Sequence, residues 1–502
     1  MRRSWPFRVR RWSSRPARLT FYSRRPRFPV WRHFLVASFV LPCLMAGGAS
    51  SAFYLRLHQE ANRATESGLA SFPRPERQQR LLVLAPHCDD ETLGVGALIA
   101  DARRRGVHVT VAFLTNGDGF EIAAQREMRD VAVNGAEMIR FAQKRQAEAL
   151  KAMHLLGVEP SDVVFLGYPD RGLKALWEKN WERNNPFRSP FTACDHSPYA
   201  QAFSPKTPYS GSALLSDLER LMRSVRPTDV FVTHPADDHP DHHTAAAFTQ
   251  AALQSCADHL GVAGDGAWAE SVKVHYYLIH RGDWPIPQGA HPDRPLLPPN
   301  GLATTDTNWR SYVPSADALA AKRRALEAYR SQTAVMGRFL RSFVRENEMF
   351  GEMEAAHVAG RTPATVLDAR RDDLVRYLDP ATDVSAMSVS RTEDGKALRV
   401  FVTLRGPVSK RVRYSLLLRA SAPPLSDADE RGLSAPPMLH TSLPVRAVGA
   451  RVLQTTVPLS TLGDEPPRCV WIAAETRWRG TGRWRNLPPL DRFGYRPFLL
   501  NF

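Results

Sequence analysis

The chain has 502 residues, enough for two or three domains at the usual size of ~150 residues each. Its 43% hydrophobic and 24% charged residues are ordinary for a globular protein, and they exclude a mainly disordered chain, a collagen-like repeat and a polytopic membrane protein. The five cysteines are too few for a disulfide framework, which leaves at most an isolated disulfide.

The net charge of +16 comes mainly from the N-terminus. Residues 1–33 contain eleven arginines and no acidic residue, and the remaining chain has 56 basic and 51 acidic residues, a net charge of +5. Basic tails occur in nucleic-acid-binding proteins, but they also precede membrane segments. Because the excess charge is confined to this tail, we expect no nucleic-acid partner.

An uncharged stretch of twenty-two residues, 34–55, follows the arginine-rich tail. It is long enough to cross the ~30 Å hydrocarbon core as a helix. Arginines before the span place the N-terminus in the cytoplasm and the rest of the chain outside it. We therefore expect a single-pass membrane anchor. Export after signal-peptide cleavage is the alternative, because AGGASSA resembles a cleavage region. Residues 56–79 would form a linker.

Buried strand patterns alternate with helical patterns after residue 80. This alternation indicates a Rossmann-like α/β domain over residues 80–375, with a mostly parallel sheet and helices on both faces. Such sheets form their sites beyond the carboxyl ends of the strands. Residues 175–212 are expected to be an insertion near the site. We predict strands at 80–85, 107–114, 162–166, 229–233 and 272–279, and helices at 92–105, 140–156, 214–225, 242–257 and 317–345.

The pattern changes near residue 379 to short alternating segments separated by Pro, Gly and Asp. It predicts an all-β accessory domain over residues 380–502, most simply a sandwich. Trp471, Trp478 and Trp484 lie in or beside an arginine-rich stretch, and their ring faces could contact a glycan. Packing in the core is the favoured role for most of them.

The first candidate motif follows the strand at 80–85 and contains His87, Cys88, Asp89, Asp90 and Glu91. A histidine and three acids beside a strand end are costly to bury unless they are paired or bound to metal. His87 and Asp90 could face one cation, since imidazole nitrogen and carboxylate oxygen are both zinc donors. The alternative is an acidic helix N-terminus, which the helix dipole favours.

The second candidate motif follows the strand at 229–233 and has four histidines in ten residues. His239 and His242 lie on one side of a helical turn that Pro240 begins. Two such clusters beyond strand ends favour a metal site over a polar surface loop. His234 and His243 carry no separate signal, and His243 is expected to be an exposed neighbour.

These motifs resemble those of the LmbE-like, or PIG-L, zinc-dependent N-acetylglucosaminyl de-N-acetylases. The family's Ala-His-Pro-Asp-Asp-Glu stands here as residues 86–91, with Pro86 and Cys88 replacing the usual alanine and proline. A free thiol at Cys88 would make the site sensitive to oxidation. The family's His-Pro-Asp-His is residues 239–242. The resemblance covers roughly residues 80–350, with further matches at 115–119, Arg145, Glu148 and 166–170.

The resemblance implies a role for each motif residue. His87, Asp90 and His242 would ligate Zn²⁺ or another divalent metal and leave a position for water. Asp89 would be the general base, and His239 would stabilise the tetrahedral oxyanion.

Four further polar residues complete the predicted site. Asp241 would orient a histidine. Arg145 and Asp170 match family positions that contact substrate hydroxyls, with a surface ion pair or helix cap as the alternative. Asp118 is a further candidate for substrate contact, with capping equally open. His275, His280 and the segment around Lys322 are expected to pack in the core or at the rim.

The resemblance implies a metal-dependent N-deacetylase that releases acetate from an N-acetylated amino sugar of a glycan, glycolipid or glycoside. Two alternatives stay open: a zinc amidohydrolase acting on a non-sugar acyl amide, and a non-catalytic envelope protein that binds carbohydrate. The intact set of candidate site residues argues against the second alternative. The sequence does not indicate an oligomeric state.

Overall fold

The computed structural model describes Ser51, Leu55 and residues 68–500, with gaps at 259–266, 283, 300, 369–373, 422–439, 444, 463–465 and 481–489. The chain divides into one unit over Met1–Leu55 and a second over Arg56–Phe502, to which the elements below belong. Apart from Ser51 and Leu55, the predicted membrane span lies outside the described residues. Within the described part of the chain, no helix is long and apolar enough to cross a membrane.

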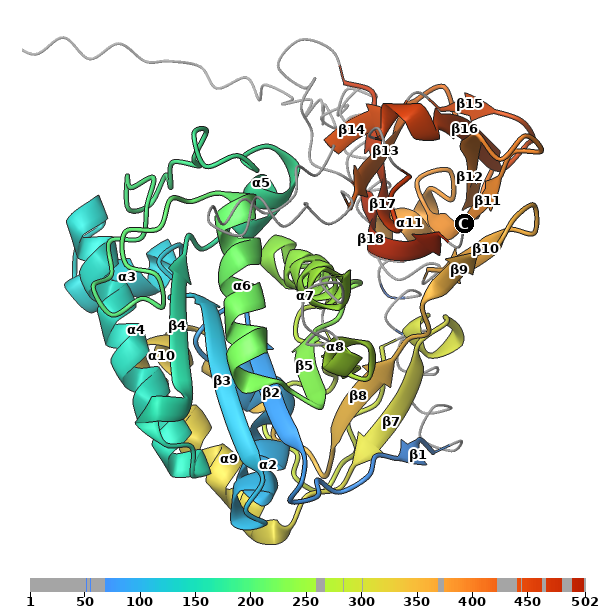
Figure 1. The fold of residues 1–502 in the computed structure, drawn as a ribbon. Coiled ribbons are helices and arrows are strands. Elements are labelled where there is room, and N and C mark those ends of the chain that lie inside the picture. The colour runs from blue at the N-terminus through green and yellow to red at the C-terminus, as the bar shows by residue number, and fades with distance from the viewer. Residues whose placement is uncertain are drawn as a thin grey trace, which may run out of the picture. The chain divides into compact units, whose positions relative to one another are not determined.

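An eight-stranded sheet forms the centre of the α/β region (Figure 1). Its order is β1-β7-β8-β6-β5-β2-β3-β4, and β6, β5, β2, β3 and β4 run parallel. The predicted α/β architecture is confirmed, while β8 is antiparallel to both of its neighbours and makes the sheet mixed. The strands are β1 (Ala70–Ser71), β2 (Arg80–Ala85), β3 (His108–Thr115), β4 (Val163–Tyr168), β5 (Asp229–Thr233), β6 (Lys273–Tyr277), β7 (Asn308–Tyr312) and β8 (Glu348–Glu352).

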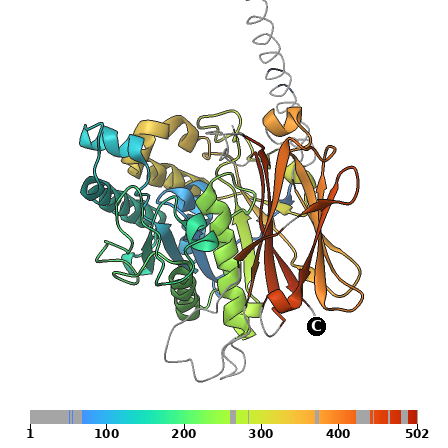
Figure 2. The same ribbon diagram turned by 90° about the horizontal axis from the view of Figure 1, so that it is seen from above.

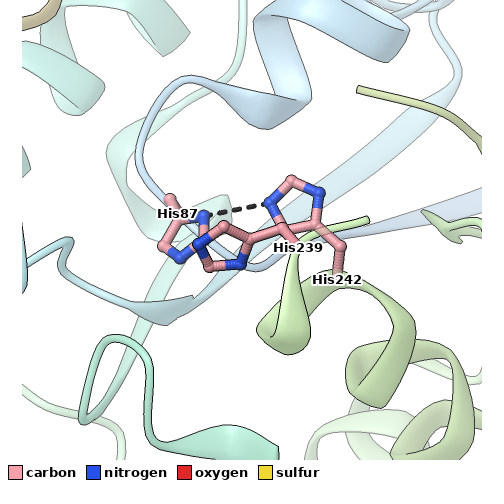
Figure 3. Close-up of side chains that lie close together, drawn as sticks. All are labelled: His87, His239 and His242. Atoms are coloured by element: carbon pink, nitrogen blue, oxygen red, sulfur yellow. Dashed lines mark hydrogen bonds between the residues drawn. The ribbon is translucent and has the colours of Figure 1, made fainter. Parts of the chain in front are cut away.

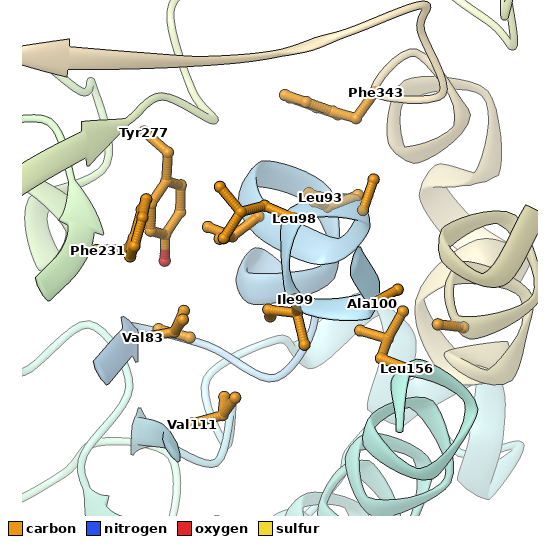
Figure 4. Packing of buried hydrophobic residues seen from close by; sticks show 14 of the residues in the cluster. Val83, Leu93, Leu98, Ile99, Ala100, Val111, Leu156, Phe231, Tyr277 and Phe343 are labelled. Carbon is orange, nitrogen blue, oxygen red and sulfur yellow. The ribbon is translucent and has the colours of Figure 1, made fainter. Parts of the chain in front are cut away.

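Helices cover both faces of this sheet because successive strand residues point to opposite sides. Val83 of β2 packs with Leu98 and Ile99 of α2 on one face, as Figure 4 shows. Leu82 and Leu84 pack on the other face with α5, α6 and α7. The helices are α2 (Asp90–Arg104), α3 (Glu121–Met128), α4 (Gly135–Leu156), α5 (Leu173–Glu178), α6 (Gly211–Val225), α7 (Pro240–Asp258), α8 (Ala267–Glu270), α9 (Ala316–Ala328), α10 (Arg330–Arg341) and α11 (Leu374–Leu378).

The single long helix predicted over 317–345 is wrong, because the chain breaks into α9 and α10 at Tyr329. Tyr329 has φ −77° and ψ 63°, outside the helical region. Its buried hydroxyl donates a hydrogen bond to Glu91 in the first motif, 2.5 Å away. This contact anchors the break between the helices to the motif after β2.

The C-terminal region contains two five-stranded sheets, ordered β10-β11-β12-β16-β15 and β14-β13-β17-β18-β9. Their apolar side chains form one core, to which Val389 and Val400 contribute from the first sheet and Leu418 and Ile472 from the second. Figure 2 shows the strands of the two sheets as layers of orange and red ribbons. The strands are β9 (Ala356–Val358), β10 (Ala364–Leu367), β11 (Val384–Arg391), β12 (Ala397–Leu404), β13 (Val412–Ala420), β14 (His440–Leu443), β15 (Arg446–Ala447), β16 (Val452–Pro458), β17 (Cys469–Trp478) and β18 (Asp491–Leu500).

The core of the α/β region continues into this C-terminal region. Trp471 and Tyr495, from β17 and β18, belong to the same buried cluster as Leu84 of β2 and Phe248 of α7. β9 and β10 lie before residue 375, yet each pairs with a strand of the C-terminal sheets. The two regions therefore share apolar packing.

Candidate active site

The two sequence motifs meet at one edge of the parallel sheet. β2 and β5 are neighbours, with the remaining parallel strands continuing from β2 through β3 to β4 and from β5 to β6. The direction of strand succession thus reverses between β2 and β5. In α/β sheets, such a reversal opens a crevice beyond the carboxyl ends of the strands. His87 follows β2, and His239 and His242 follow β5, so the fold places both motifs at this position.

The turn after β2 holds Asp89 in an unusual conformation. Its φ is 144°, which residues other than glycine rarely adopt and which costs on the order of 1–3 kcal/mol. The carboxylate of Glu91 accepts a hydrogen bond from the Asp89 amide at 3.1 Å and further bonds from Thr92 and Tyr329. Glu91 thus fixes the backbone that presents Asp89 to the site.

Three donor atoms converge from His87, Asp90 and His242. His87 Nδ1 lies 3.0 Å from His242 Nε2 and 3.2 Å from Asp90 Oδ2, and His242 Nε2 lies 3.1 Å from Asp90 Oδ2. Figure 3 shows the facing nitrogens of His87 and His242, with His239 beside them. His239 is half-buried, whereas the other three residues are buried.

The outer nitrogens of His87 and His242 each face a carboxylate. His87 Nε2 lies 3.1 Å from Asp170 Oδ1 and 3.3 Å from Asp241 Oδ2. His242 Nδ1 lies 3.2 Å from Asp237 Oδ2. When neutral, a ring held in this way carries its proton on the outer nitrogen and directs a lone pair at the convergence point. Carboxylate partners of this kind orient metal-binding histidines.

This donor set fits a divalent metal. Two lone-pair nitrogens and a carboxylate oxygen at such short range repel one another unless a proton or cation lies between them. Donors about 2.0–2.1 Å from a tetrahedral zinc ion are about 3.3 Å apart, close to the spacing here. His239 and His280 are near enough to take part in alternative donor groupings. Zinc, or another divalent metal, is the cofactor of this site.

Arg145 is buried and bonds to the two loops that carry the site. Its guanidinium donates to the carbonyls of Cys88 at 2.8 Å and Gly117 at 3.1 Å, and it lies 3.5 Å from Asp89 Oδ1. The alternative of a surface ion pair is wrong for this residue. Gly117 has φ +68°, and a Cβ there would overlap the guanidinium, so the loop requires glycine.

The electrostatics of Asp89 follow from this enclosure. Burial raises the pKa of Asp89 to about 8, and the neighbouring Arg145 charge opposes that rise. A metal cation bound at the adjacent donors would also favour the carboxylate form. Asp89 therefore has competing influences that suit a group which takes up and releases a proton.

Asp118 and Asp170, two of the candidates for substrate contact, lie next to each other and are buried. Asp118 accepts from the amide of Asp170 at 2.9 Å and from the hydroxyl of Tyr199 in the insertion at 2.6 Å. Burial and the neighbouring Asp170 charge raise the pKa of Asp118 to about 6. Burial alone would raise the pKa of Asp170, but the facing His87 ring holds it well below its usual range.

Two expectations about individual residues are corrected, and one is confirmed. His243 is buried at 3% exposure, because its ring packs beneath the loop and its Nδ1 lies 3.3 Å from the Asp237 carbonyl. Cys88 is fully buried, and burial raises the pKa of its thiol, which disfavours the reactive thiolate. Trp471 is 1% exposed and belongs to the core, which confirms the favoured role of core packing for this residue.

Trp478 remains 42% exposed and donates to Asp379, and Trp484 lies outside the described residues.

Sequence reasoning missed Asp237 and undervalued His280. Asp237 accepts from the amides of His239, Ile279 and His280 besides facing His242. The His280 ring lies 4.9 Å from that of His242. The signal for Asp237 was its position in the loop between β5 and α7, whereas the approach of His280 depends on the end of β6.

Comparisons with known proteins agree with this geometry. The sequence model of the family PIG-L, described as GlcNAc-PI de-N-acetylase, matches residues 82–253. A 1D-myo-inositol 2-acetamido-2-deoxy-alpha-D-glucopyranoside deacetylase from Kribbella flavida is 30% identical over 326 residues, which are 60% of this chain and 97% of that relative. The enzyme of the same name from Nocardioides sp. is 30% identical over 281 residues, 52% of this chain and 85% of the relative.

Among solved structures, N,N'-diacetylchitobiose deacetylase from Pyrococcus horikoshii is 19% identical, with a TM-score of 0.33 over 54% of this chain and 82% of that one. The family model matches residues 82–253, and the relative from Kribbella flavida is 30% identical over 97% of its length. The chain therefore belongs to the PIG-L family of de-N-acetylases and is a hydrolase of amides.

Proposed function

We propose that this protein removes the acetyl group from an N-acetylated amino sugar of the N-acetylglucosamine type, present in a glycan, glycolipid or glycoside. Water adds to the amide carbonyl, the C–N bond breaks, and the products are acetate and a free amine. The observation that carries the proposal is the convergence of His87, Asp90 and His242 beside Asp89 and His239. Relatives named as deacetylases of such a sugar support this substrate class.

A divalent metal held by His87, Asp90 and His242 would supply Lewis-acid activation of the amide carbonyl and of water. Asp89 takes the proton from the attacking water and delivers it to the departing nitrogen, as a general base that becomes a general acid. Arg145 holds the Asp89 carboxylate in place from the buried side.

His239 is suited to donate to the developing oxyanion. Its Nδ1 accepts the amide of Asp241 at 3.2 Å, so the neutral ring carries its proton on Nε2. Burial and the neighbouring histidines hold the pKa of His239 well below its usual range, which keeps the ring neutral. The Nε2–H can therefore donate a hydrogen bond to the oxygen that gains charge as water adds.

The test compares Asp89→Asn, Asp90→Asn and His239→Ala for zinc content and acetate release on the same preparations. Asp89→Asn keeps zinc and loses about 10²-fold or more in kcat, because positioned proton transfer contributes 10²–10⁴-fold. His239→Ala keeps zinc and loses about 10²–10³-fold. Asp90→Asn loses zinc.

Two outcomes of the same experiment would contradict these roles. If Asp89→Asn loses zinc and Asp90→Asn retains it, Asp89 is the ligand and Asp90 is the base. If both variants keep full turnover, the motif takes no part in catalysis. A substrate panel of N-acetylated sugars and non-sugar N-acyl amides tests the class, since hydrolysis of the latter alone would favour the amidohydrolase alternative.

We also propose that residues 34–55 anchor the protein and that its catalytic region lies outside the cytoplasm. The support is the uncharged span that follows eleven arginines. Release after signal cleavage is the competing outcome.

A further inference from the structure

We infer that the C-terminal β-region, which comprises β9 to β18, contributes to catalysis by holding site residues in position. Arg419 of β13 positions α5, and α5 in turn positions the segment 170–173 against His87. The inference rests on the proposed function for its activity measurement, and it assigns the β-region a positioning role.

The segment 170–173 contacts the site directly. Asp170 Oδ1 and Asp241 Oδ2 both face His87 Nε2. The Asp241 carboxylate in turn accepts the backbone amides of Arg171 at 2.6 Å and Leu173 at 3.0 Å. Leu173 is the first residue of α5, so the position of this short helix sets the position of Asp170 and the support of Asp241.

α5 is held by the β-region. Arg419 is 1% exposed, donates a hydrogen bond to the carbonyl of Trp177 in α5, and has its guanidinium carbon 5.2 Å from the Trp177 ring and 4.2 Å from the Trp181 ring. The fully buried Trp177 ring also packs edge-on against Trp471 at 6.0 Å and Tyr495 at 5.5 Å. One side of α5 is thus enclosed by residues from β13, β17 and β18.

A second, charged contact holds the start of the helix. Lys174, next to Leu173, pairs with Glu475 of β17 at 3.2 Å. Tyr495 of β18 lies 3.4 Å from the carboxylate of Glu178 at the other end of α5. A helix of six residues has little intrinsic stability, so its position depends on these tertiary contacts.

β18 also contacts the loop between β5 and α7, and this contact does not involve α5. The backbone at Gly494 approaches Pro235 so closely that an added Cβ would lie 2.2 Å from the Pro235 carbonyl oxygen. Pro235 is two residues before Asp237, the carboxylate that faces His242. The β-region therefore contacts both chain segments that orient the ligand histidines.

The test uses the full chain and five variants, one of which, Arg419→Lys, keeps the positive charge at residue 419. Arg419→Met keeps the length of the side chain but removes its charge and donors, and Lys174→Met removes the second contact while Glu475 keeps Arg477 as a partner at 2.8 Å. Arg399→Met repeats the first change on an exposed position of β12, and Val400→Ala opens the core of the β-region away from α5. Thermal unfolding ranks their stabilities.

Amide hydrogen exchange over residues 169–178, zinc affinity, and kcat and KM for acetate release are measured on each folded variant. We expect faster exchange in this segment and about a 10-fold or greater loss of kcat in Arg419→Met, with a smaller loss in Lys174→Met, because small displacements of positioned groups cost up to about 10²-fold. Arg419→Lys restores part of the loss. Val400→Ala lowers the thermal stability, but its hydrogen exchange over residues 169–178 and its kcat equal those of the unmodified protein.

The inference is overturned if Arg419→Met and Lys174→Met both show the same hydrogen exchange over residues 169–178 and the same kcat as the unmodified protein. It is also overturned if Val400→Ala loses as much kcat as Arg419→Met at the same stability. If Arg419→Met does not fold, Lys174→Met alone decides by the same two criteria. If the parent protein releases no acetate from any sugar while exchange in 169–178 still rises only in these two variants, the proposed function fails and the positioning role stands.

Discussion

Asp237 connects three parts of the site through one buried carboxylate. Its Oδ2 faces His242 Nδ1 and accepts the amides of Ile279 and His280 at 2.9 Å each, while Oδ1 accepts the amide of His239 at 3.0 Å. The carboxylate therefore favours a proton on the outer nitrogen of His242, and it connects the loop between β5 and α7 to the segment that follows β6. Removing its charge weakens both effects at once.

We predict that Asp237→Asn lowers zinc affinity by about 10–100-fold, the usual effect of changing a carboxylate behind a ligand histidine. The matched control is Asp238→Asn, because the neighbouring carboxylate is 42% exposed and contacts Arg281 and Gly282 rather than a ligand. Competition with a chelator measures both affinities, and circular dichroism checks the fold. If the two variants have the same zinc affinity, Asp237 does not contribute to metal binding.

At the scale of elements, α2 depends on a buried ion pair from two other segments. Lys322 of α9 and Glu348 of β8 pair at 2.8 Å, and both are about 1% exposed. Lys322 donates to the Leu93 carbonyl, and Glu348 accepts from the amides of Ala97 and Leu98. Leu93 and Ala97 are four residues apart, so the ion pair binds the carbonyl and amide of one helical turn.

We predict that Lys322→Met lowers the free energy of unfolding by about 3–5 kcal/mol, because it leaves the Glu348 charge buried without its partner. Arg341→Met is the control, since Arg341 and Glu327 form an exposed pair with side chains 41% and 51% accessible. That change costs about 0–1 kcal/mol. Urea unfolding measures both, and a cost below about 1 kcal/mol for Lys322→Met would show that α2 does not rely on the pair.

Elements whose burial is encoded locally could be predicted from the sequence. β5 matches its prediction, and β2 does so as well, because their apolar runs are continuous. The break at Tyr329 could not be predicted, since helical spacing continues through it and the cause is a hydroxyl contact with distant Glu91. β8 contains two glutamates and a glycine, and its Glu348 is buried against the Lys322 ammonium group of α9, a contact that the local sequence pattern does not indicate.

The same distinction explains the site. The residues of the two motifs are adjacent in sequence and follow strand ends, so their convergence could be inferred from α/β architecture alone. The part played by His280 could not, because it depends on where β6 ends relative to α7. The metal-ligand and catalytic roles remain predictions that the variants above test.

At the scale of the whole molecule, the arginine-rich tail and uncharged span predict an orientation. We predict that an alkaline phosphatase reporter joined after residue 60 is active in intact cells, because the charge flank retains the N-terminus in the cytoplasm. A reporter that functions only in the cytoplasm, fused at the same residue, serves as the control. Activity of the latter alone would reverse the topology, and a mature N-terminus near residue 50 would favour cleavage.

The pairing of β18 with β9 joins two strands that are synthesised at different times. β9 leaves the ribosome long before β18, so the sheet that contains both stays incomplete until the later strand arrives. The backbone of β18 also lies against Pro235, in the loop between β5 and α7. A nascent chain can therefore carry both sequence motifs while the loop that contains Pro235 still lacks its contact with β18.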